Sequence, residues 1–289
     1  MKKILFIINP VSGIGKQKKL EKIINKHLDK NKFNFDVRYT KYAGHATEIT
    51  KKATRLYDAV IIAGGDGSVN EVAQSLINTN TALGIIPTGS GNGFARHLKL
   101  PLKPENAIDV INNFKMKTVD TGIVNNRKFV NIAGIGFDAD MSYEFANINK
   151  RGFLGYAKVI FTSFNKIRGK YFKLKLNDEE IEGRFFIIAF SNGSQYGLNA
   201  VISPLSKLND GIAEVIIIKH FPLFLAPFLA LKLFTGKINK TKYCEIYKTT
   251  KIKIINDKTI FAHADGEPFV ITRSAEIQLV PKSLKVITP

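Results

Sequence analysis

Short apolar runs alternate with helical patterns along the first third of the chain. Residues 4–8, 58–63 and 83–86 have the composition of buried strands, and residues 35–39 alternate like a half-exposed strand. Helical periodicity is found between them, at about residues 17–28, 45–56 and 68–77. This order of strands and helices predicts a parallel sheet that is covered by helices on both faces.

Near residues 117–120 the pattern changes to one that is dominated by strands. The strands predicted after this point are residues 129–132, 171–176, 181–190, 213–218, 251–255, 259–264, 269–272 and 276–280. Asn177-Asp178-Glu179-Glu180 is typical of a hairpin turn, and two helical inserts are expected at about 141–166 and 221–233. The sequence therefore predicts an α/β N-terminal domain (1–120) with a Rossmann-like parallel sheet, and an all-β, sandwich-like C-terminal domain (121–280).

Three loops rich in small residues follow predicted strands, at residues 9–15, 64–68 and 87–93. Because parallel strands end at one edge of a sheet, we expect the three loops to share that edge, where ligands bind in such folds. The loop 9–15 lacks the Walker pattern. Glycine permits a positive φ or a close approach of a ligand, and backbone amides beside a helix N-terminus form an anion cradle. These loops predict a phosphate site.

A single carboxylate, Asp66, lies between two glycines of the middle loop. The following residues, Ser68-Val69-Asn70-Glu71, form a capping box in which Ser68 is the N-cap and Glu71 reaches back to it. Capping explains Ser68 and Glu71, but it does not explain Asp66. A chemical role for Asp66 is therefore predicted.

Several motifs occur in one order along nearly the whole chain: Asn9-Pro10 with Ser12-Gly13, Gly64-Gly65-Asp66-Gly67-Ser68 through Asn70-Glu71-Val72, the 87–96 loop, Asn209-Asp210-Gly211 and Asp265-Gly266-Glu267-Pro268. Together they resemble the diacylglycerol kinase catalytic family, which includes bacterial soluble lipid kinases and the sphingosine and ceramide kinases. Two positions depart from the bacterial diacylglycerol-type pattern. Ser68 stands where threonine is usual, and Asn92-Gly93 stands where an Asn-Asp pair is usual, which leaves the identity of the lipid open.

The resemblance implies that ATP binds between the two domains, with Mg²⁺ as a further cofactor. The residues implied to bind the nucleotide are Asn9, Ser12, Thr40, Gly64, Gly65, Asp66, Gly67, Ser68, Glu71, Thr88, Gly89, Ser90 and Asn92. Glu267 is implied to be the base that takes the proton from a lipid hydroxyl, and Asp66 to act through Mg²⁺ or to share the base role. Asp210, with the carbonyls of Lys207 and Ile212, matches a structural Mg²⁺ site. The tail 281–289 is implied to return to the first domain through residues 284–287.

Some of these residues have plainer explanations. Asp210 in Asn-Asp-Gly is as well explained by a turn as by a metal. For Asp265 we favour a hairpin turn. His45, His97, His220 and His263 show no ligand spacing, and we interpret them as incidental.

Composition adds a preference for anionic partners. The formal net charge is +19, which favours a nucleotide, an acidic membrane surface or a nucleic acid. No Arg-rich block is present, so a nucleic acid is not expected. The single cysteine, Cys244, excludes an intrachain disulfide and fits a reducing compartment. The N-terminal run is interpreted as a strand rather than a signal peptide, and no apolar run is long enough for a membrane span.

Residues 221–234 are apolar at eleven of fourteen positions. We favour a core helix, with an acyl-chain groove or a membrane-docking element as the alternative. The basic segment 150–173 suits an anionic bilayer surface or a solvated face equally well.

The sequence as a whole predicts an ATP- and Mg²⁺-dependent lipid kinase in the cytoplasm, peripheral to the membrane where its lipid substrate lies. It would transfer the γ-phosphate to a hydroxyl of a diacylglycerol-like or sphingoid lipid. The oligomeric state, including a homodimer, is left open. The alternatives are an NAD kinase-like enzyme with a soluble substrate and a non-catalytic protein that binds a nucleotide or lipid.

Overall fold

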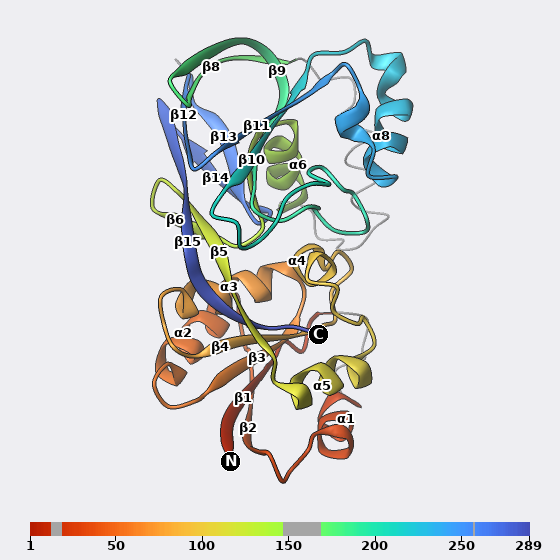
Figure 1. Ribbon diagram of the computed structural model, residues 1–289, viewed down its shortest axis with the longest axis vertical. Coiled ribbons are helices and arrows are strands. Elements are labelled where there is room, and N and C mark those ends of the chain that lie inside the picture. The colour runs from red at the N-terminus through yellow and green to blue at the C-terminus, as the bar shows by residue number, and fades with distance from the viewer. Residues whose placement is uncertain (13–18, 147–168, 257) are drawn as a thin grey trace. The chain divides into compact units, whose positions relative to one another are not determined.

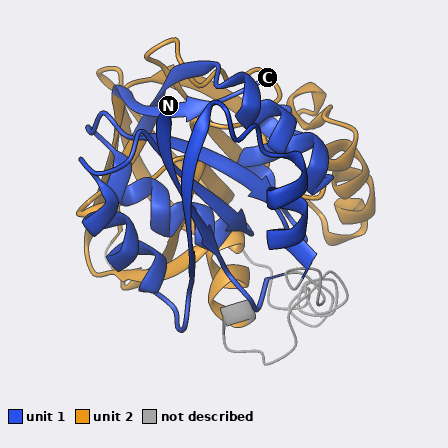
Figure 2. Cartoon of the chain, turned by 90° about the horizontal axis from the view of Figure 1, so that it is seen from below, with its two compact units in different colours: residues 1–121, 281–289 blue, residues 122–280 orange. Residues whose placement is uncertain are grey.

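The computed structural model describes residues 1–12, 19–146, 169–256 and 258–289. The chain divides into two compact units (Figures 1 and 2). Unit 1 consists of Met1–Thr121 and Pro281–Pro289, and unit 2 consists of Gly122–Val280. Most of the basic segment 150–173 and the later part of the expected helix 141–166 lie outside the described residues.

Unit 1 is built on parallel strands in the order β4-β3-β1-β2. The elements of its first 113 residues are β1 Lys2–Ile8, α1 Leu20–His27, β2 Phe33–Tyr39, α2 His45–Ala53, β3 Ala59–Gly64, α3 Asp66–Leu76, β4 Ala82–Pro87, α4 Gly93–His97 and α5 Pro104–Asn113. Helix α2 packs on α3 and α1 on α5, and Figure 1 shows these pairs on opposite sides of the strands. Every residue of β3 and β4 is buried, as a doubly covered sheet requires. The predicted α/β architecture is confirmed.

The end of the chain completes unit 1. Strand β15 (Ser274–Ile287) pairs with β4 in parallel at Val286 and Leu83. The Asp120 carboxylate accepts the Lys282 N–H at 2.7 Å, and the Ser283 carbonyl accepts the Asn78 N–H at 2.7 Å. The C-terminal residues are therefore fixed to unit 1 by side-chain and backbone bonds.

Unit 2 is dominated by antiparallel strands, in the order β14-β13-β7-β9-β8-β12-β15, with β10 on β9 and β11 on β10. Its remaining elements, with β5 entering from unit 1, are β5 Met116–Val124, β6 Arg127–Phe129, β7 Ile132–Gly136, α6 Phe137–Ala146, β8 Lys170–Leu176, β9 Glu179–Ser191, β10 Ala213–Lys219, η3 Leu223–Leu225, α8 Ala226–Phe234, η4 Ile238–Lys240, β11 Cys244–Thr249, β12 Lys251–Ile255, β13 Ile260–Ala264 and β14 Glu267–Ile271. The predicted turn between β8 and β9 is confirmed, since Asn177 and Asp178 both have positive φ.

Strand β10 contains consecutive apolar residues instead of alternating apolar and polar ones. Val215 and Ile217 contribute to one buried cluster, with Phe190 of β9, whereas Ile216 and Ile218 contribute to a second cluster. Both faces of this strand are covered, so residues 215–218 are all apolar. The predicted sandwich-like C-terminal domain is confirmed.

The apolar segment 221–234 forms η3 and α8, but it is not the buried core helix that we favoured from its composition. Ala226 and Leu229 are buried, whereas Phe224 is 79% exposed and Leu231 is 61% exposed. Only one side of the helix packs against the strands. Among the described residues, no helix is both long enough and apolar enough to span a bilayer.

Cys244, at the start of β11, is expected to resist alkylation. Burial raises the pKa of its thiol to about 12, with a smaller contribution from Glu245. At pH 8 the reactive thiolate would be about one part in ten thousand of the folded protein. Iodoacetamide labelling followed by mass spectrometry should be slow until the pH approaches 12, and it should accelerate at pH 8 when urea unfolds the chain. Labelling of the folded protein at the rate of a free thiol would contradict this prediction.

Candidate functional site

The described parts of the three small-residue loops of unit 1 lie together at the carboxyl ends of β1, β3 and β4, and residues 13–15 of the first loop lie outside the described residues. The Asn9 side-chain amide donates to Ser68 Oγ at 2.8 Å, and Ser12 Oγ lies 2.9 Å from Thr88 Oγ1. Thr40 lies at the end of the adjacent β2, where its N–H donates to the Ile8 carbonyl. The expectation that these loops share one edge is confirmed.

The glycines of these loops are needed for backbone packing rather than for a left-handed conformation. The described glycines with positive φ do not include Gly64, Gly65 or Gly89. A Cβ added to Gly89 would lie 2.5 Å from the Gly65 Cα, and one added to Gly64 would lie 2.5 Å from the Ser68 Cβ. The loops therefore meet backbone to backbone, at a distance that only glycine permits.

Asn92 stabilises the third loop, residues 87–93, by hydrogen bonds within that loop. It has a φ of 52°, is buried, and stands at the N-cap of α4. Its Oδ1 accepts the Gly89 N–H at 3.1 Å, and its Nδ2 donates to the Gly89 carbonyl at 2.7 Å. Both ends of the side-chain amide thus hold the loop, whereas the neighbouring Ser90 is exposed.

The predicted capping box is wrong. Helix α3 begins at Asp66 with Gly65 at its N-cap, so Ser68 lies inside the first turn and receives the Asn9 bond described above. The Glu71 carboxylate instead accepts the N–H groups of Gly44 and Ala46, at 2.9 and 3.1 Å, at the start of α2. Glu71 therefore caps a neighbouring helix.

The N-terminus of α3 is an electropositive feature of this edge. Its N-cap residue, Gly65, has no side chain that could cap it, and the first N–H groups of a helix point out of its N-terminal end. The helix dipole adds a partial positive charge at the same place. Asp66, partly exposed, is the first residue of this turn. This geometry is suited to binding an anionic group beside a carboxylate.

The second group of predicted residues belongs to unit 2, in the turn between β13 and β14. Asp265 and Gly266 both have positive φ, as the predicted hairpin turn requires. The Asp265 carboxylate accepts three consecutive backbone N–H groups, from Val130, Asn131 and Ile132, at 2.8 to 3.0 Å. Glu267 follows this turn as the exposed first residue of β14. Its backbone is thus held, while its carboxylate faces solvent.

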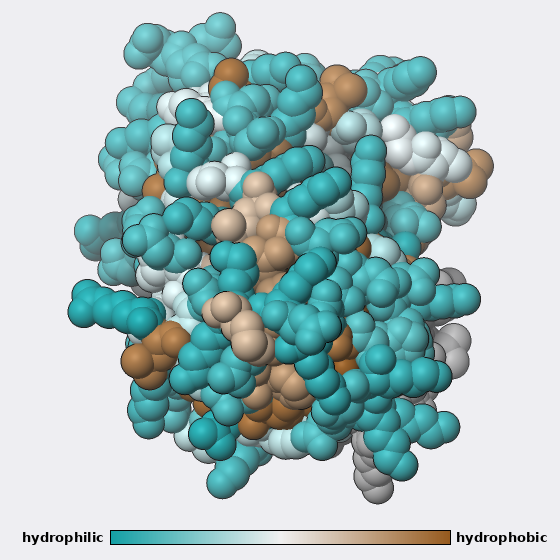
Figure 3. All heavy atoms as spheres, turned by 60° about the horizontal axis from the view of Figure 1, so that its bottom comes forward, coloured by the Kyte–Doolittle hydropathy of each residue, from teal (hydrophilic) through white to brown (hydrophobic). Residues whose placement is uncertain are grey.

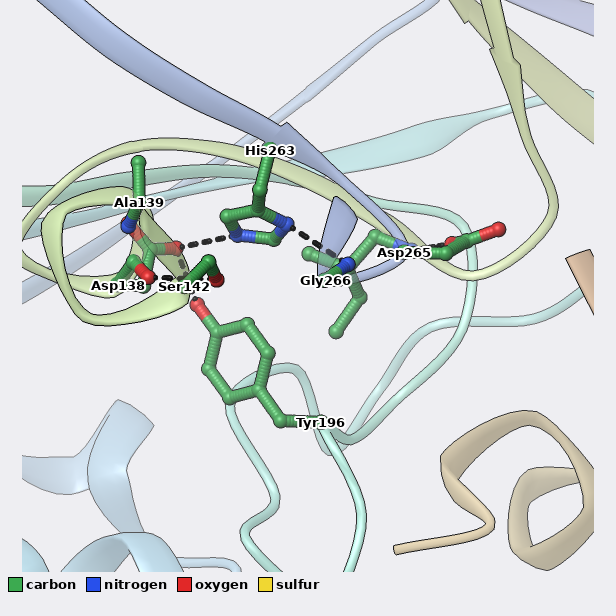
Figure 4. Close-up of polar contacts among 8 residues, drawn as sticks. Asp138, Ala139, Ser142, Tyr196, His263, Asp265 and Gly266 are labelled. Carbon is green, nitrogen blue, oxygen red and sulfur yellow. Dashed lines mark hydrogen bonds and ion pairs between the residues drawn. The ribbon is translucent and has the colours of Figure 1, made fainter. Parts of the chain in front are cut away.

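A buried polar network lies on the other side of the same turn (Figure 4). His263 Nε2 lies 3.0 Å from Asp138 Oδ2, and the Tyr196 hydroxyl donates to the same oxygen at 2.8 Å. The Gly266 N–H donates to His263 Nδ1 at 3.3 Å. Because an N–H can only donate, Nδ1 is the acceptor, and Nε2 carries the proton that is donated to Asp138.

This network corrects the interpretation of His263 as incidental. His263 is 2% exposed and stands opposite Gly134 of β7. A Cβ at Gly134 would lie 2.3 Å from Asp138 Oδ2, so the glycine provides the space for the pair. Asp138 and His263 are 125 residues apart, and no local pattern indicates that they meet.

The loop with Asp210 has the donors of a hard-cation site in its sequence, and the structure shows a turn there. Asp210 is exposed, and its Oδ1 accepts the Ile212 N–H at 3.2 Å. The Ser203 hydroxyl donates to the buried Glu214 carboxylate and closes the base of the loop. Among the described residues, no group of three or more His, Cys, Asp or Glu could hold a metal. One carboxylate with backbone carbonyls and water still fits the oxygen chemistry of Mg²⁺.

The sequence matches family models along nearly its whole length. Residues 3–124 match the diacylglycerol kinase catalytic domain, and residues 131–288 match the YegS C-terminal NAD kinase beta sandwich-like domain. The chain belongs to the diacylglycerol kinase catalytic-domain family of lipid kinases.

Individual relatives agree with this assignment. The chain is 28% identical over 274 residues to a diacylglycerol kinase of Bacillus subtilis (strain 168), covering 92% of this chain and 90% of the relative. It is 30% identical over 273 residues to a diacylglycerol kinase of Staphylococcus saprophyticus, covering 92% of this chain and 89% of that relative. The crystal structure of a diacylglycerol kinase from Bacillus anthracis has a TM-score of 0.77 at 22% identity, covering 100% of this chain and 97% of that one. This last likeness supports the fold.

Gly89→Ala is expected to separate the two loops that meet at Gly65. The added Cβ would overlap backbone atoms, so the free energy of unfolding should fall by about 1–3 kcal/mol in urea titrations. Ser90→Ala, at the exposed next position, is the matched control and should change it by less than about 0.5 kcal/mol. Equal stability of both variants would show that the contact is not tight.

Asp138→Asn is expected to weaken the buried network, because the neutral amide is a poorer acceptor for His263 and Tyr196. We expect a loss of about 1–3 kcal/mol of unfolding free energy, against about 1 kcal/mol for Tyr196→Phe, which removes the hydroxyl that donates to Asp138. In a double-mutant cycle the two losses should not add. Additive losses would indicate that the two side chains act independently.

Proposed function

We propose that this protein is an ATP- and Mg²⁺-dependent kinase that transfers the γ-phosphate to a hydroxyl of a lipid. The observation that carries the proposal is the N-terminus of α3, which has glycine at its N-cap and Asp66 in its first turn, at the edge where three small-residue loops meet. Family membership supports a lipid acceptor. The names of the relatives favour a diacylglycerol-like lipid over a sphingoid one.

In this proposal the phosphates of ATP lie against the N–H groups of the α3 first turn. The hydroxyls of Ser12, Ser68 and Thr88 stand at the same edge and could donate to phosphate oxygens. The bonds of Asn9 and Asn92 keep the loops in place before ATP arrives, which lowers the entropy cost of binding. Phosphoryl transfer depends mainly on such positioning and on charge neutralisation.

Two carboxylates, one in each unit, have the proposed catalytic roles. Glu267 takes the proton from the lipid hydroxyl, whose oxygen then forms the new bond to the γ-phosphorus as the bond to ADP breaks. Asp66 holds Mg²⁺ or shares the base role. When bound there, Mg²⁺ would supply positive charge that offsets the charge of the transferring phosphoryl group. Asp210, with the carbonyls of Lys207 and Ile212, is the proposed site of a second, structural Mg²⁺.

The proposal includes a cytoplasmic location with peripheral contact to the membrane that contains the lipid, and no nucleic-acid partner. A homodimer is neither required nor excluded by it. The main alternative is a soluble acceptor such as NAD. Its support is the NAD kinase-like sandwich named in the family model of residues 131–288, which concerns fold rather than substrate.

A side-by-side assay separates these functions. The full chain is incubated with radiolabelled ATP and Mg²⁺ against diacylglycerol in mixed micelles, sphingosine in mixed micelles, and NAD. We expect label in the diacylglycerol product. Label in NAD alone would overturn the lipid assignment, and nucleotide binding without any labelled product would favour a non-catalytic role.

Glu267→Ala is expected to lower turnover by a factor of about 10²–10⁴, the usual contribution of a general base, while ATP binding is retained. Asp66→Asn should also lower turnover, and it should alter the Mg²⁺ dependence. Glu276→Ala, which removes another exposed carboxylate of unit 2, is the control and should be fully active. Unchanged turnover in Glu267→Ala would remove Glu267 from the mechanism.

A further inference from the structure

Five large apolar side chains of η3 and α8 lie at the surface of unit 2. We call them the α8 crest: they are Leu223, Phe224, Phe228, Leu231 and Phe234, with exposed fractions of 41%, 79%, 46%, 61% and 49%. Figure 1 shows α8 at the edge of unit 2, and the space-filling view shows brown apolar atoms reaching the surface along the same edge (Figure 3). Contiguous apolar patches of this kind on proteins mark interaction sites.

The exposed residues of the crest are different from the residues by which α8 packs on the core. Helix α8 already packs on the strands through Ala226, Leu229 and Leu233, against a cluster that includes Ile216 and Ile218. Within α8 the exposed residues 228 and 231 are three positions apart and so share a face, and the exposed Phe224 precedes them in η3. The apolar residues of α8 therefore divide between those that pack on the strands and those that remain exposed.

The segment of chain that carries the crest has basic residues and no acidic ones. Residues 215–244 contain no Asp or Glu. Lys232 belongs to α8, with its Nζ 5.2 Å from the centre of the Phe228 ring, and Lys237, Lys240 and Lys242 follow as exposed residues. Lysine ammonium groups beside large apolar side chains are the combination that binds at the interface of an anionic bilayer.

The same charges argue against a second copy of the chain as the occupant. A two-fold dimer through the crest would place identical patches against each other, and so would bring these lysines close to their own copies. No acidic residue within 215–244 could offset that repulsion. Phosphate headgroups provide the opposite charge, and acyl chains accept the phenylalanines.

We propose that the α8 crest, with Lys232, Lys237, Lys240 and Lys242, is the surface by which the protein docks on an anionic bilayer. The inference rests on the proposed lipid kinase function and deepens it, because it names where the enzyme meets the membrane that contains its substrate. Phe228 and Leu231 insert at the level of the headgroups, and the lysines pair with phosphates around them. Docking at this surface leaves the residues proposed for phosphoryl transfer unaltered.

The test is co-sedimentation of the full chain with phosphatidylcholine vesicles, with and without phosphatidylglycerol. We expect binding to the anionic vesicles only. Phe228→Ser with Leu231→Ser should weaken it by about tenfold or more, since two large apolar side chains are lost from the bilayer. Leu56→Ser, at a residue of unit 1 that is 63% exposed, is the matched control and should bind like the wild type. Equal binding of the crest variant and the wild type would overturn the proposal.

A second variant tests the charges independently and covers the case in which the crest variant fails to fold. Lys237→Ala with Lys240→Ala and Lys242→Ala should weaken binding by about fivefold for each lysine that faces the headgroups at low salt, and less at high salt. If vesicle binding does not depend on salt and the lysine variant binds as well as the wild type, the lysines have no role in docking. Light scattering tests whether a second copy of the chain occupies the crest instead. If the wild type is a dimer, the crest variant is a monomer, and both bind vesicles equally, the crest is a dimer interface.

The outcome is separable from that of the proposed function. Phosphorylation of diacylglycerol dispersed in detergent micelles needs no bilayer, so both docking variants should retain wild-type turnover there. Activity in micelles with no vesicle binding by the wild type would overturn docking alone. The opposite outcome is also distinct. If the wild type binds vesicles, the crest variant does not, and neither phosphorylates any lipid, then the docking surface is supported and the kinase proposal is overturned.

Discussion

The proposed nucleotide site depends on a contact between two peptide backbones. Gly65 and Gly89 approach so closely that a methyl group on either one would touch the other loop. This contact lets the loops after β3 and β4 lie directly against each other, beside the hydroxyl pair of Ser12 and Thr88. The N-terminus of α3 opens at the same edge. Glycine is therefore conformationally unremarkable here, with ordinary φ values, and essential for steric reasons.

The elements of unit 1 could be predicted from the sequence because their signals are local. Apolar runs and loop composition indicated β1, β3 and β4, and parallel topology then placed their loops at one edge. The capping box failed because a local motif cannot show which helix a glutamate reaches. Glu71 is three residues from Ser68, yet it serves the N–H groups of Gly44 and Ala46. The Glu71 carboxylate binds backbone groups that lie near it in the folded protein, and not the start of its own helix.

The predictions for unit 2 were weaker where its structure depends on pairing between distant residues. The motif around Glu267 was recognised, but the support of its turn was not. That support comes from three backbone N–H groups near residue 131 and from the Asp138–His263 pair. The composition of α8 indicated an apolar helix correctly and could not show how its residues divide between core and surface. That division depends on which strands lie beneath the helix, and those strands come from other parts of the sequence.

The two units interleave along the chain, because residues 281–289 belong to unit 1 although they follow all of unit 2. This has a consequence for biosynthesis. When the first 121 residues have left the ribosome, β4 still lacks β15, and the carbonyl of Ser283 that accepts the Asn78 N–H has not been made. The side of β4 that pairs with β15 therefore stays open until the residues of β15 have been made. A chain that stopped within unit 2, before Val280, would leave both units incomplete.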